Sequence, residues 1–413
     1  MLADVPDDAR AMKEEPFGPL ALLSPVKTLD EVIEKANSLP YGLAAYAFTR
    51  SARNVDQFAE PKPRSAASKI RAMGARAGPK ASNVIRSRRT SRTSSSNWWT
   101  GAAAMKFGIH NPSWMYGPDP AEAFEQVKDK AQWAENHGFV WFSVMDHLIQ
   151  IPGVGVADEP FFEGWTMLSA LAAATSRIRL ATLATSVGYR NPAHLAKIAA
   201  SVDLISRGRL TLGIGAGYFE TEYRQYGWEF QMRPATRIRQ LEEAVRLILA
   251  LWADKRTTFH GRYFHAEDAI LEPKPLQKPH PPVLIAGGGE QLTLRAVARL
   301  GDGCNIGGDL ETVRHKLAVL RRHCDVAQRD YDAVEKTHNN SWLLARDAAA
   351  VATKRERLSS RGPLRGFVGT VSEATDLIGR YRDAGVQLLI NSDYRNDQET
   401  HELFAAEIMP HFT

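Results

Sequence analysis

The chain has 413 residues, of which 44% are hydrophobic and 24% charged, and its formal net charge is +5. These values are ordinary for a globular protein, and no run approaches the roughly 18 apolar residues of a membrane-spanning helix. The N-terminus lacks the basic and apolar regions of a secretory signal, and Cys304 and Cys324 belong to no cluster with metal-ligand spacing. The sequence therefore predicts a reduced, cytoplasmic protein with no metal and no membrane segment.

Residues 1–60 have the pattern of folded-protein sequence. Apolar residues recur at helical spacing over residues 27–42, and a short strand is predicted over residues 43–49. The stretches EEPFGPL and YGLAAYAFTR resemble the C-terminal part of the aldehyde dehydrogenase family, where Glu15 and Phe17 would match positions touching the nicotinamide end of NAD. That family's nucleophilic cysteine, general base and dinucleotide-binding half would lie upstream. The resemblance therefore predicts a truncated fragment without dehydrogenase activity.

Residues 61–104 account for the positive charge of the chain. They contain ten Lys or Arg and no Asp or Glu, so the rest of the chain carries a formal charge of −5, which is the total of +5 less these ten. The segment has no periodic apolar pattern and cannot bury enough apolar surface to offset its ordering entropy. We expect a disordered basic linker. The abrupt change in composition suggests that an upstream gene fragment lost its reading frame and ran into the next reading frame, whose natural start is Met105. Without interleaved aromatic residues, the segment does not predict nucleic-acid binding.

From Met105 onward, short apolar runs alternate with amphipathic segments that predict helices of 10–18 residues. The predicted strands are residues 105–110, 139–147, 177–185, 209–217, 283–289, 303–308, 339–346 and 386–393. Eight strand–helix units in about 309 residues favour a closed (β/α)8 TIM barrel with insertions over an open doubly wound sheet. The first turn, HNPSWMYGPDP, also lacks the G-x-G-x-x-G fingerprint of a dinucleotide-binding domain.

Polar residues at the carboxyl ends of the second and fourth strands are the catalytic candidates, because a barrel builds its active site there. The second strand ends in Asp146 and His147, which could place an imidazole against a developing charge, although a loop hydrogen bond would explain them too. The fourth strand leads through alternating glycines into an acidic and aromatic loop. In that loop Tyr218 could face the substrate, and Glu220 and Glu222 could act as acid or base or anchor the loop.

Small residues and glycines at other strand ends predict a cofactor site. Leu183, Ala184 and Thr185 would let a flat ring lie against the third strand. Two glycine-rich turns each precede a predicted helix, and their exposed N–H groups suit one phosphate. These turns comprise Gly287, Gly288 and Gly289 after the fifth strand, and Asn305, Ile306, Gly307 and Gly308 after the sixth.

The segment from Met105 onward resembles the luciferase-like (LLM class) flavin and deazaflavin oxidoreductase family over its full length. The resemblance is carried by VMDHL, by RIRLATLATSVGYRNPAHLAKIAASVDLISRGRLTLGIGAGYFETEY, by VLIAGGGEQLTLRAVARLGDGCNIGG and by TVRHKLAVLRRHC. It is similar to the branch that uses coenzyme F420. The resemblance implies a homodimer, Asp146 and His147 near the ring, a non-proline cis peptide at Leu183–Ala184, and the two glycine turns at the phosphate and ribityl group.

This chain differs from the F420-using branch at one position. The sugar-phosphate dehydrogenases of that branch have a catalytic glutamate where this chain has Tyr218. We therefore expect hydride transfer between F420 and a small organic substrate that the sequence does not specify. His147, oriented by Asp146, would manage the proton, and Tyr218 or Glu220 would line the substrate side. The alternatives are an FMN-dependent monooxygenase that uses reduced flavin and oxygen, and a non-catalytic fusion assembled through the N-terminal fragment.

Overall fold

The structure is a computed structural model that describes residues 2–3, 22–23, 28, 104–114, 119–359 and 363–412. The chain divides into two compact units, Met1–Thr93 and Ser94–Thr413. In the first, strand β1 (Leu2–Ala3) pairs in parallel with β2 (Leu22–Leu23). Apart from those strands, Thr28 and Ala104, the predictions for the aldehyde dehydrogenase-like fragment and the basic linker, including Glu15 and Phe17, lie outside the described residues.

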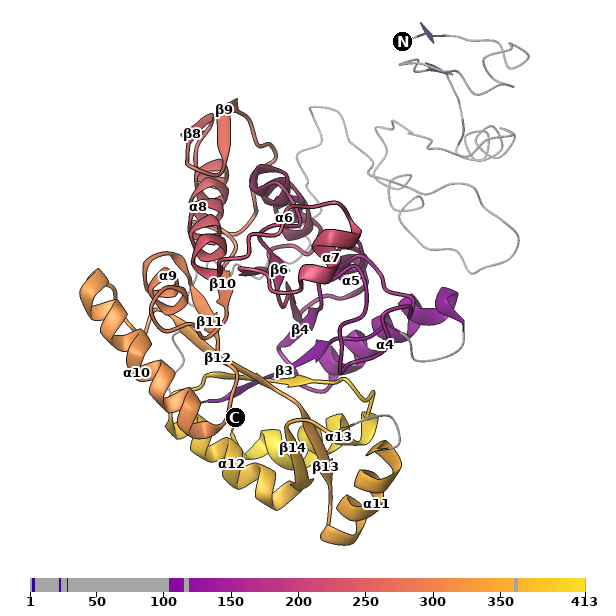
Figure 1. Ribbon diagram of the computed structural model, residues 1–413. Helices are drawn as coiled ribbons and strands as arrows, with labels where there is room; N and C mark the ends of the chain where they lie inside the picture. The colour runs from indigo at the N-terminus through magenta and orange to yellow at the C-terminus, as the bar shows by residue number, and fades with distance from the viewer. Residues whose placement is uncertain are drawn as a thin grey trace. The chain divides into compact units, whose positions relative to one another are not determined.

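Eight parallel strands of the second unit close into a barrel (Figure 1), which confirms the predicted fold. The ring closes because β10 pairs with β7 as well as with β11, and the first strand, β3, pairs with the last, β15. The two-residue strand β6 (Thr185–Ser186) pairs with the carboxyl end of β7. The barrel strands are β3 (Lys106–Asn111), β4 (Trp141–Val144), β5 (Arg179–Thr182), β7 (Leu210–Gly215), β10 (Val283–Ala286), β11 (Gly303–Asn305), β12 (Glu335–Asn340) and β15 (Leu388–Ser392).

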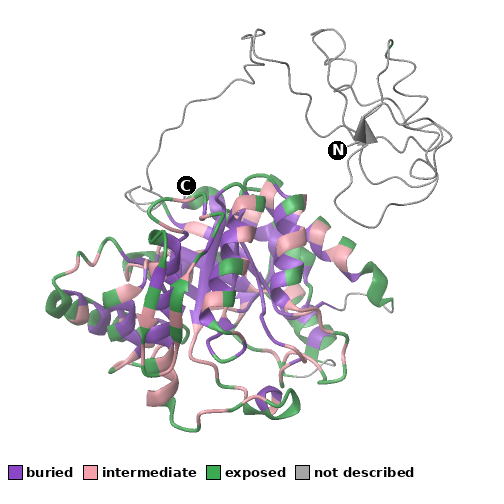
Figure 2. Ribbon diagram, turned by 90° about the horizontal axis from the view of Figure 1, so that it is seen from above, coloured by how far each residue is buried: buried purple, intermediate pink, exposed green. Residues whose placement is uncertain are grey.

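Helices surround this barrel, and Figure 2 shows their buried faces turned toward the buried strands. Local sequence sets several of their starts: Asn191 caps α6 with Pro192 in its first turn, and Thr370 and Glu373 form a capping box at α12. No described helix has the length and apolar character needed to cross a membrane. The helices that flank the barrel are α4 (Ala123–Asn136), α5 (Gly164–Ala174), α6 (Pro192–Ile205), α8 (Pro234–Ala253), α9 (Thr293–Leu300), α10 (Leu310–Ala327), α12 (Val371–Asp383) and α13 (Gln398–Leu403).

The seventh predicted strand is wrong in position. The barrel strand β12 covers residues 335–340, whereas the apolar run Trp342–Ala345 forms β13, which pairs with β14 (Phe367–Thr370) in a separate two-stranded sheet. Hydrophobicity misleads here because β13 is buried among aromatic rings outside the barrel, with Trp342 against Phe367 and Phe404. The barrel strand itself carries buried charge, as in the ion pair between Lys106 and Glu335.

Several further elements do not follow from the sequence patterns described above. Helix α5 is rich in small and apolar residues on nearly every side, so it has little amphipathic contrast. A hairpin of β8 (Thr257–His260) and β9 (His265–Ala269) lies beside α8 (Figure 1). The short helix α7 (Glu220–Gln225) follows β7, and α11 (Ala348–Ser359) lies between β13 and β14 in the chain. Of these, α7 contributes most to the site.

Gly213 and Gly215 of strand β7 provide a matched test of close packing in the barrel wall. A Cβ at Gly213 would lie 1.9 Å from the carbonyl oxygen of Thr182, whereas one at Gly215 would meet nothing nearer than 3.6 Å. We therefore expect Gly213→Ala to lower the free energy of unfolding by about 2–3 kcal/mol, and Gly215→Ala to lower it by under about 1 kcal/mol. Urea denaturation of both variants measures this difference, and equal stabilities would contradict the packing argument.

Candidate active site

A cavity of about 650 Å³ opens at the carboxyl ends of the barrel strands, where the sequence placed the site. It brings together side chains from loops that are far apart in the chain. Most of the predicted site residues lie in its wall: Asp146, His147, Leu183, Ala184, Thr185, Tyr218, Gly287, Gly288 and Gly289. No group of three or more His, Cys, Asp or Glu among the described residues could hold a metal ion.

One wall of the cavity is flat and built from small residues. The Leu183–Ala184 peptide is cis, as the family resemblance implied. A Cβ placed on Gly215 would make only ordinary contacts, 3.9 Å from the Cβ of Ala184 and 3.6 Å from the carbonyl oxygen of Ala286, and none of these three residues has a side chain larger than a methyl group. This surface fits one face of a planar ring.

The first glycine turn lies in the same cavity and has a positive group beneath it. Gly287 has a φ of +125°, which favours glycine, and a Cβ on Gly288 would come within 3.0 Å of the Lys316 side chain. The Lys316 ammonium donates to the carbonyl oxygen of Gly288 at 2.5 Å. A turn of glycines beside a lysine, just before α9, suits a phosphate group.

The second glycine turn is separate from the cavity wall. Asn305 instead donates its amide to Thr337, Ile306 is buried, and Gly307 and Gly308 are exposed. The side chain of Asp309 accepts from the N–H of Thr312 at 2.8 Å and so places a carboxylate at the start of α10. The phosphate contact of these four residues stays a prediction, because none of them lines the cavity that holds the first turn.

His147 lies in the cavity wall and is held by Glu222, not by Asp146. Its Nδ1 lies 2.6 Å from Oε2 of Glu222, whose side chain is fully buried. The same carboxylate accepts from the backbone N–H groups of Leu148 and Ile149 and from the hydroxyl of Tyr189. Burial acts to raise the pKa of Glu222, but the hydrogen bonds from His147, Leu148 and Tyr189 outweigh it and leave that pKa below its usual value.

Asp146 is paired with an arginine, which overturns the predicted contact with His147. Its two carboxylate oxygens accept from Arg190 at 2.7 and 2.9 Å, and Arg190 also contacts Glu163. A guanidinium offers two parallel donors to a carboxylate, whereas an imidazole offers one. Asp146 therefore anchors the turn after β6 to the end of β4.

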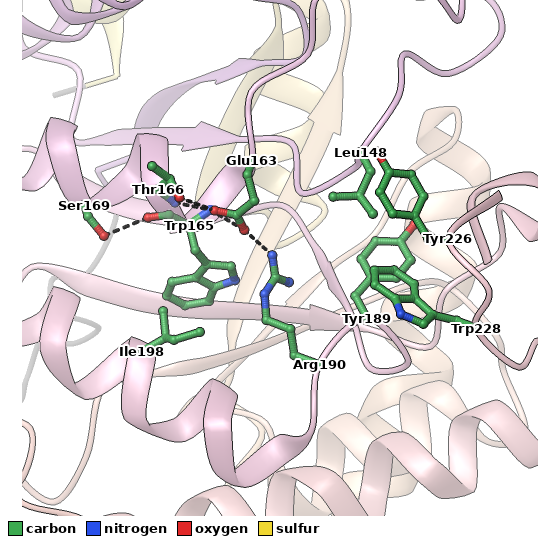
Figure 3. Close-up of a pocket in the computed structure, with 10 residues that line it drawn as sticks. All are labelled: Leu148, Glu163, Trp165, Thr166, Ser169, Tyr189, Arg190, Ile198, Tyr226 and Trp228. Atoms are coloured by element: carbon green, nitrogen blue, oxygen red, sulfur yellow. Dashed lines mark hydrogen bonds and ion pairs between the residues drawn. The ribbon is translucent and has the colours of Figure 1, made fainter. Parts of the chain in front are cut away.

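Arg190 also borders a second cavity, of about 410 Å³, beside the first. In Figure 3 the ion pair of Arg190 and Glu163 lies beside Trp165 and Ile198, and the rings of Tyr189, Tyr226 and Trp228 stand on the other side. Tyr189 lines both cavities, so its ring forms part of the partition between them.

The loop after β7 places its acidic residues differently from the prediction. Glu220 is exposed and outside the cavity wall, whereas Glu222, two residues further into α7, is the buried acid. Tyr218 does line the cavity; the residue is 64% exposed, and its ring stands edge-on to His147, with centroids 5.8 Å apart. The signal that could have distinguished the two acids is the helical register of α7, in which Glu222 and Tyr223 lie on the buried side.

His110, at the end of β3, is a cavity residue that sequence analysis missed. It is 4% exposed, and its Nδ1 lies 3.0 Å from the hydroxyl of Ser143. Burial, followed by the nearby charge of His147, lowers its pKa from 6.5 to about 4. Its place at a strand end, like that of His147, was the available signal.

The lowered pKa of His110 predicts a pH dependence of stability. Between pH 6.5 and 4 the unfolded chain binds a proton at this residue and the folded chain does not, so stability falls as the pH is lowered through this window. His110→Gln should reduce that fall by up to about 3 kcal/mol, as judged by urea denaturation across the window. Parallel curves for the variant and the parent protein would show that His110 does not carry this effect.

A closed (β/α)8 barrel with a flat-walled cavity at the carboxyl ends of its strands forms a site that suits a small molecule with a planar ring. Residues 105–405 match the luciferase-like monooxygenase family, and the chain belongs to this family. A weak match to the aldehyde dehydrogenase family covers residues 1–65, in agreement with the resemblance seen in the sequence.

Two of the similar proteins are named for activities that depend on different cofactors. An F420-dependent glucose-6-phosphate dehydrogenase of Gordonia bronchialis is 32% identical over 226 residues, 52% of this chain and 64% of that protein. The FMNH(2)-dependent dimethylsulfone monooxygenase of Pseudomonas putida is 29% identical over 249 residues, 59% of this chain and 66% of that protein. An uncharacterised protein of Mycobacterium tuberculosis is 33% identical over 186 residues, 42% of this chain and 64% of that protein. The chain thus covers just under two thirds of these relatives.

Solved structures agree on the fold. The F420-dependent tetrahydromethanopterin reductase of Methanopyrus kandleri has a TM-score of 0.61 at 19% identity, over 75% of this chain and all of that chain. A monooxygenase of Streptomyces bottropensis has a TM-score of 0.62 at 23% identity, with the same coverage. At these identities the likeness establishes the barrel and not the reaction.

Proposed function

We propose that the barrel is an oxidoreductase that transfers a hydride between coenzyme F420 and a small organic substrate. The observation that carries this proposal is the arrangement of one cavity, in which a flat wall of small residues, a glycine turn over Lys316 and the ring of His147 all meet. The flat wall suits a planar deazaflavin, and the glycine turn suits its phosphate. Bound there, F420 would supply a two-electron hydride donor or acceptor.

Within this proposal His147 is the group that holds or receives the proton. The Nδ1 atom is occupied by Glu222, so Nε2 is the ring nitrogen free to serve the reaction. Tyr218, at the mouth of the cavity, lines the substrate side and stands in place of the glutamate of the sugar-phosphate dehydrogenases. We therefore propose a substrate other than a sugar phosphate. Asp146 acts on the loop through Arg190 and not on the proton.

The alternative is a flavin-dependent monooxygenase, and the relative from Pseudomonas putida gives it weight. That reaction would use the same flat wall and phosphate turn. It differs in needing oxygen and a reduced flavin supplied by a partner enzyme. The choice between the two cofactors is therefore a question of binding preference.

Titration of the purified protein with F420 and with FMN separates these two functions. We expect F420 to bind at least tenfold more tightly, as followed by fluorescence quenching of each cofactor. Gly288→Val is the matched control, because its side chain would enter the space of Lys316 in the phosphate turn and should weaken both cofactors. Tighter binding of FMN would reject the F420 proposal and favour the monooxygenase.

Replacement of His147 tests its chemical role directly. His147→Ala should keep the fold and the F420 affinity but slow hydride transfer at least tenfold, because no group remains to exchange the proton. Stopped-flow absorbance of F420 measures the rate of hydride transfer. His265→Ala, an exposed histidine in the hairpin strand β9, is the control and should transfer hydride at the parent rate. Unchanged transfer in His147→Ala would remove the assignment.

A further inference from the structure

Glu222 is a buried carboxylate with an unusual number of donors. Its side chain is 0% exposed, yet it belongs to the short helix α7 and reaches across to the loop after β4. Oε1 accepts from the backbone N–H groups of Leu148 and Ile149, and Oε2 accepts from Nδ1 of His147 and from the hydroxyl of Tyr189. A buried charge is costly unless hydrogen bonds satisfy it, and these four contacts do so.

We propose that Glu222 is the positioning residue for His147, and that it fixes the imidazole as the tautomer protonated at Nδ1 with Nε2 open to the cavity. A carboxylate that is ionised can only accept, so the ring nitrogen facing it must carry the hydrogen. In the neutral ring the other nitrogen then bears the lone pair, which is the form that can take a proton from a substrate. This inference rests on the proposed function only for its catalytic consequence, since the tautomer exists without any cofactor.

The groups around His147 are consistent with this assignment. Tyr189 donates to the same oxygen of Glu222, and its pKa is raised by burial and by that hydrogen bond, so the hydroxyl keeps its proton. His110 stays neutral near neutral pH, because its pKa is about 4. Tyr218 meets the imidazole with its ring edge-on. Asp146 is paired with Arg190, so Glu222 is the carboxylate available to the ring.

The catalytic consequence concerns where the proton goes. F420 held in this cavity would supply a two-electron hydride acceptor for the C–H bond of a substrate alcohol, and Nε2 of His147 would take the proton released from the substrate O–H. The imidazolium that forms lies 2.6 Å from the ionised Glu222, which stabilises it through its Nδ1–H. In reduction of a carbonyl the same proton returns to oxygen. Glu222 touches neither substrate nor cofactor and acts through the ring.

A purely structural role for Glu222 would give a different experimental result. The carboxylate also ties α7 to residues 148 and 149, so removing it could loosen the loop without affecting the imidazole. Loss of activity in a variant therefore does not decide the matter. The decisive readout is the protonation pattern of the His147 ring, which nitrogen-15 NMR reports through the separate shifts of Nδ1 and Nε2.

The first measurement uses the parent protein without cofactor, at a pH raised until the His147 ring carries a single N–H. The His147 signals, assigned by their absence from His147→Ala, should show a hydrogen on Nδ1 and a lone pair on Nε2. A ring protonated at Nε2 alone would overturn the proposal, and this result does not depend on any variant of Glu222. Because F420 is absent, the result is also independent of the proposed reaction.

The second measurement compares three variants. Glu222→Gln presents an amide whose N–H₂ can donate to Nδ1, so the ring should switch to the Nε2–H tautomer and the rate of hydride transfer should fall by about 10²–10⁴-fold, with F420 affinity within twofold. Tyr189→Phe should retain the Nδ1–H tautomer, because the pair of Glu222 and His147 is intact. Glu229→Gln, an exposed acid in the same loop, should match the parent in both tautomer and rate.

The outcomes separate this inference from the proposed function. A tautomer switch in Glu222→Gln together with the loss in rate supports Glu222 as the positioning residue. A variant that keeps the Nδ1–H tautomer but loses activity would overturn it in favour of a structural role. If the tautomer switches but the parent protein binds no F420, the proposed function fails while the assignment of Glu222 stands.

Discussion

The pairing of β10 with β7 closes the barrel and also creates the surface on which the site depends. In this register Ala286 lies opposite Gly215, and Ile285 lies opposite Ile214. Because neither Ala286 nor Gly215 has a side chain longer than a methyl group, the wall between them is flat and faces the cavity. The same closure fixes the glycine turn that follows β10 next to the end of β7. A shape that suits a planar cofactor thus results from the requirement that the sheet have no open edge.

Asp146 and Glu222 are buried carboxylates at this end of the barrel, and each has its own partner. Asp146 is matched by Arg190 through two hydrogen bonds, and Glu222 is matched by His147, a phenol and two backbone N–H groups. An unpaired charge in such a place would cost several kcal/mol, so the pairing is close to obligatory. Because Arg190 satisfies Asp146, Glu222 is the carboxylate that orients the imidazole. Electrostatic matching of this kind assigns roles to residues whose types alone leave them interchangeable.

Much of the fold could be predicted, because alternating strands and helices have distinct hydrophobic periods. The cavity residues at the ends of β4, β5 and β10 were found for a similar reason, since a parallel barrel gathers the carboxyl ends of its strands. The predictions were wrong where the hydrophobicity of a segment does not indicate whether it belongs to the barrel. Strand β12 contains a buried Glu335 within the barrel, while the apolar strand β13 lies outside it, so an apolar run identified the wrong strand. Helix α5 was missed because its sides differ too little in polarity.

By itself the sequence determined the (β/α)8 barrel, the family resemblance, and the residue types at the strand ends, including His147 and the glycine turn. These are local features, set by short-range periodicity and by backbone freedom. Only the tertiary structure decided which acid serves His147. Asp146 is its neighbour in the chain but pairs with Arg190, 44 residues away, whereas Glu222 reaches the ring from 75 residues away. Contacts between loops of different strands depend on barrel closure and on the competition among buried charges. The spacing of residues along the chain predicts neither of these.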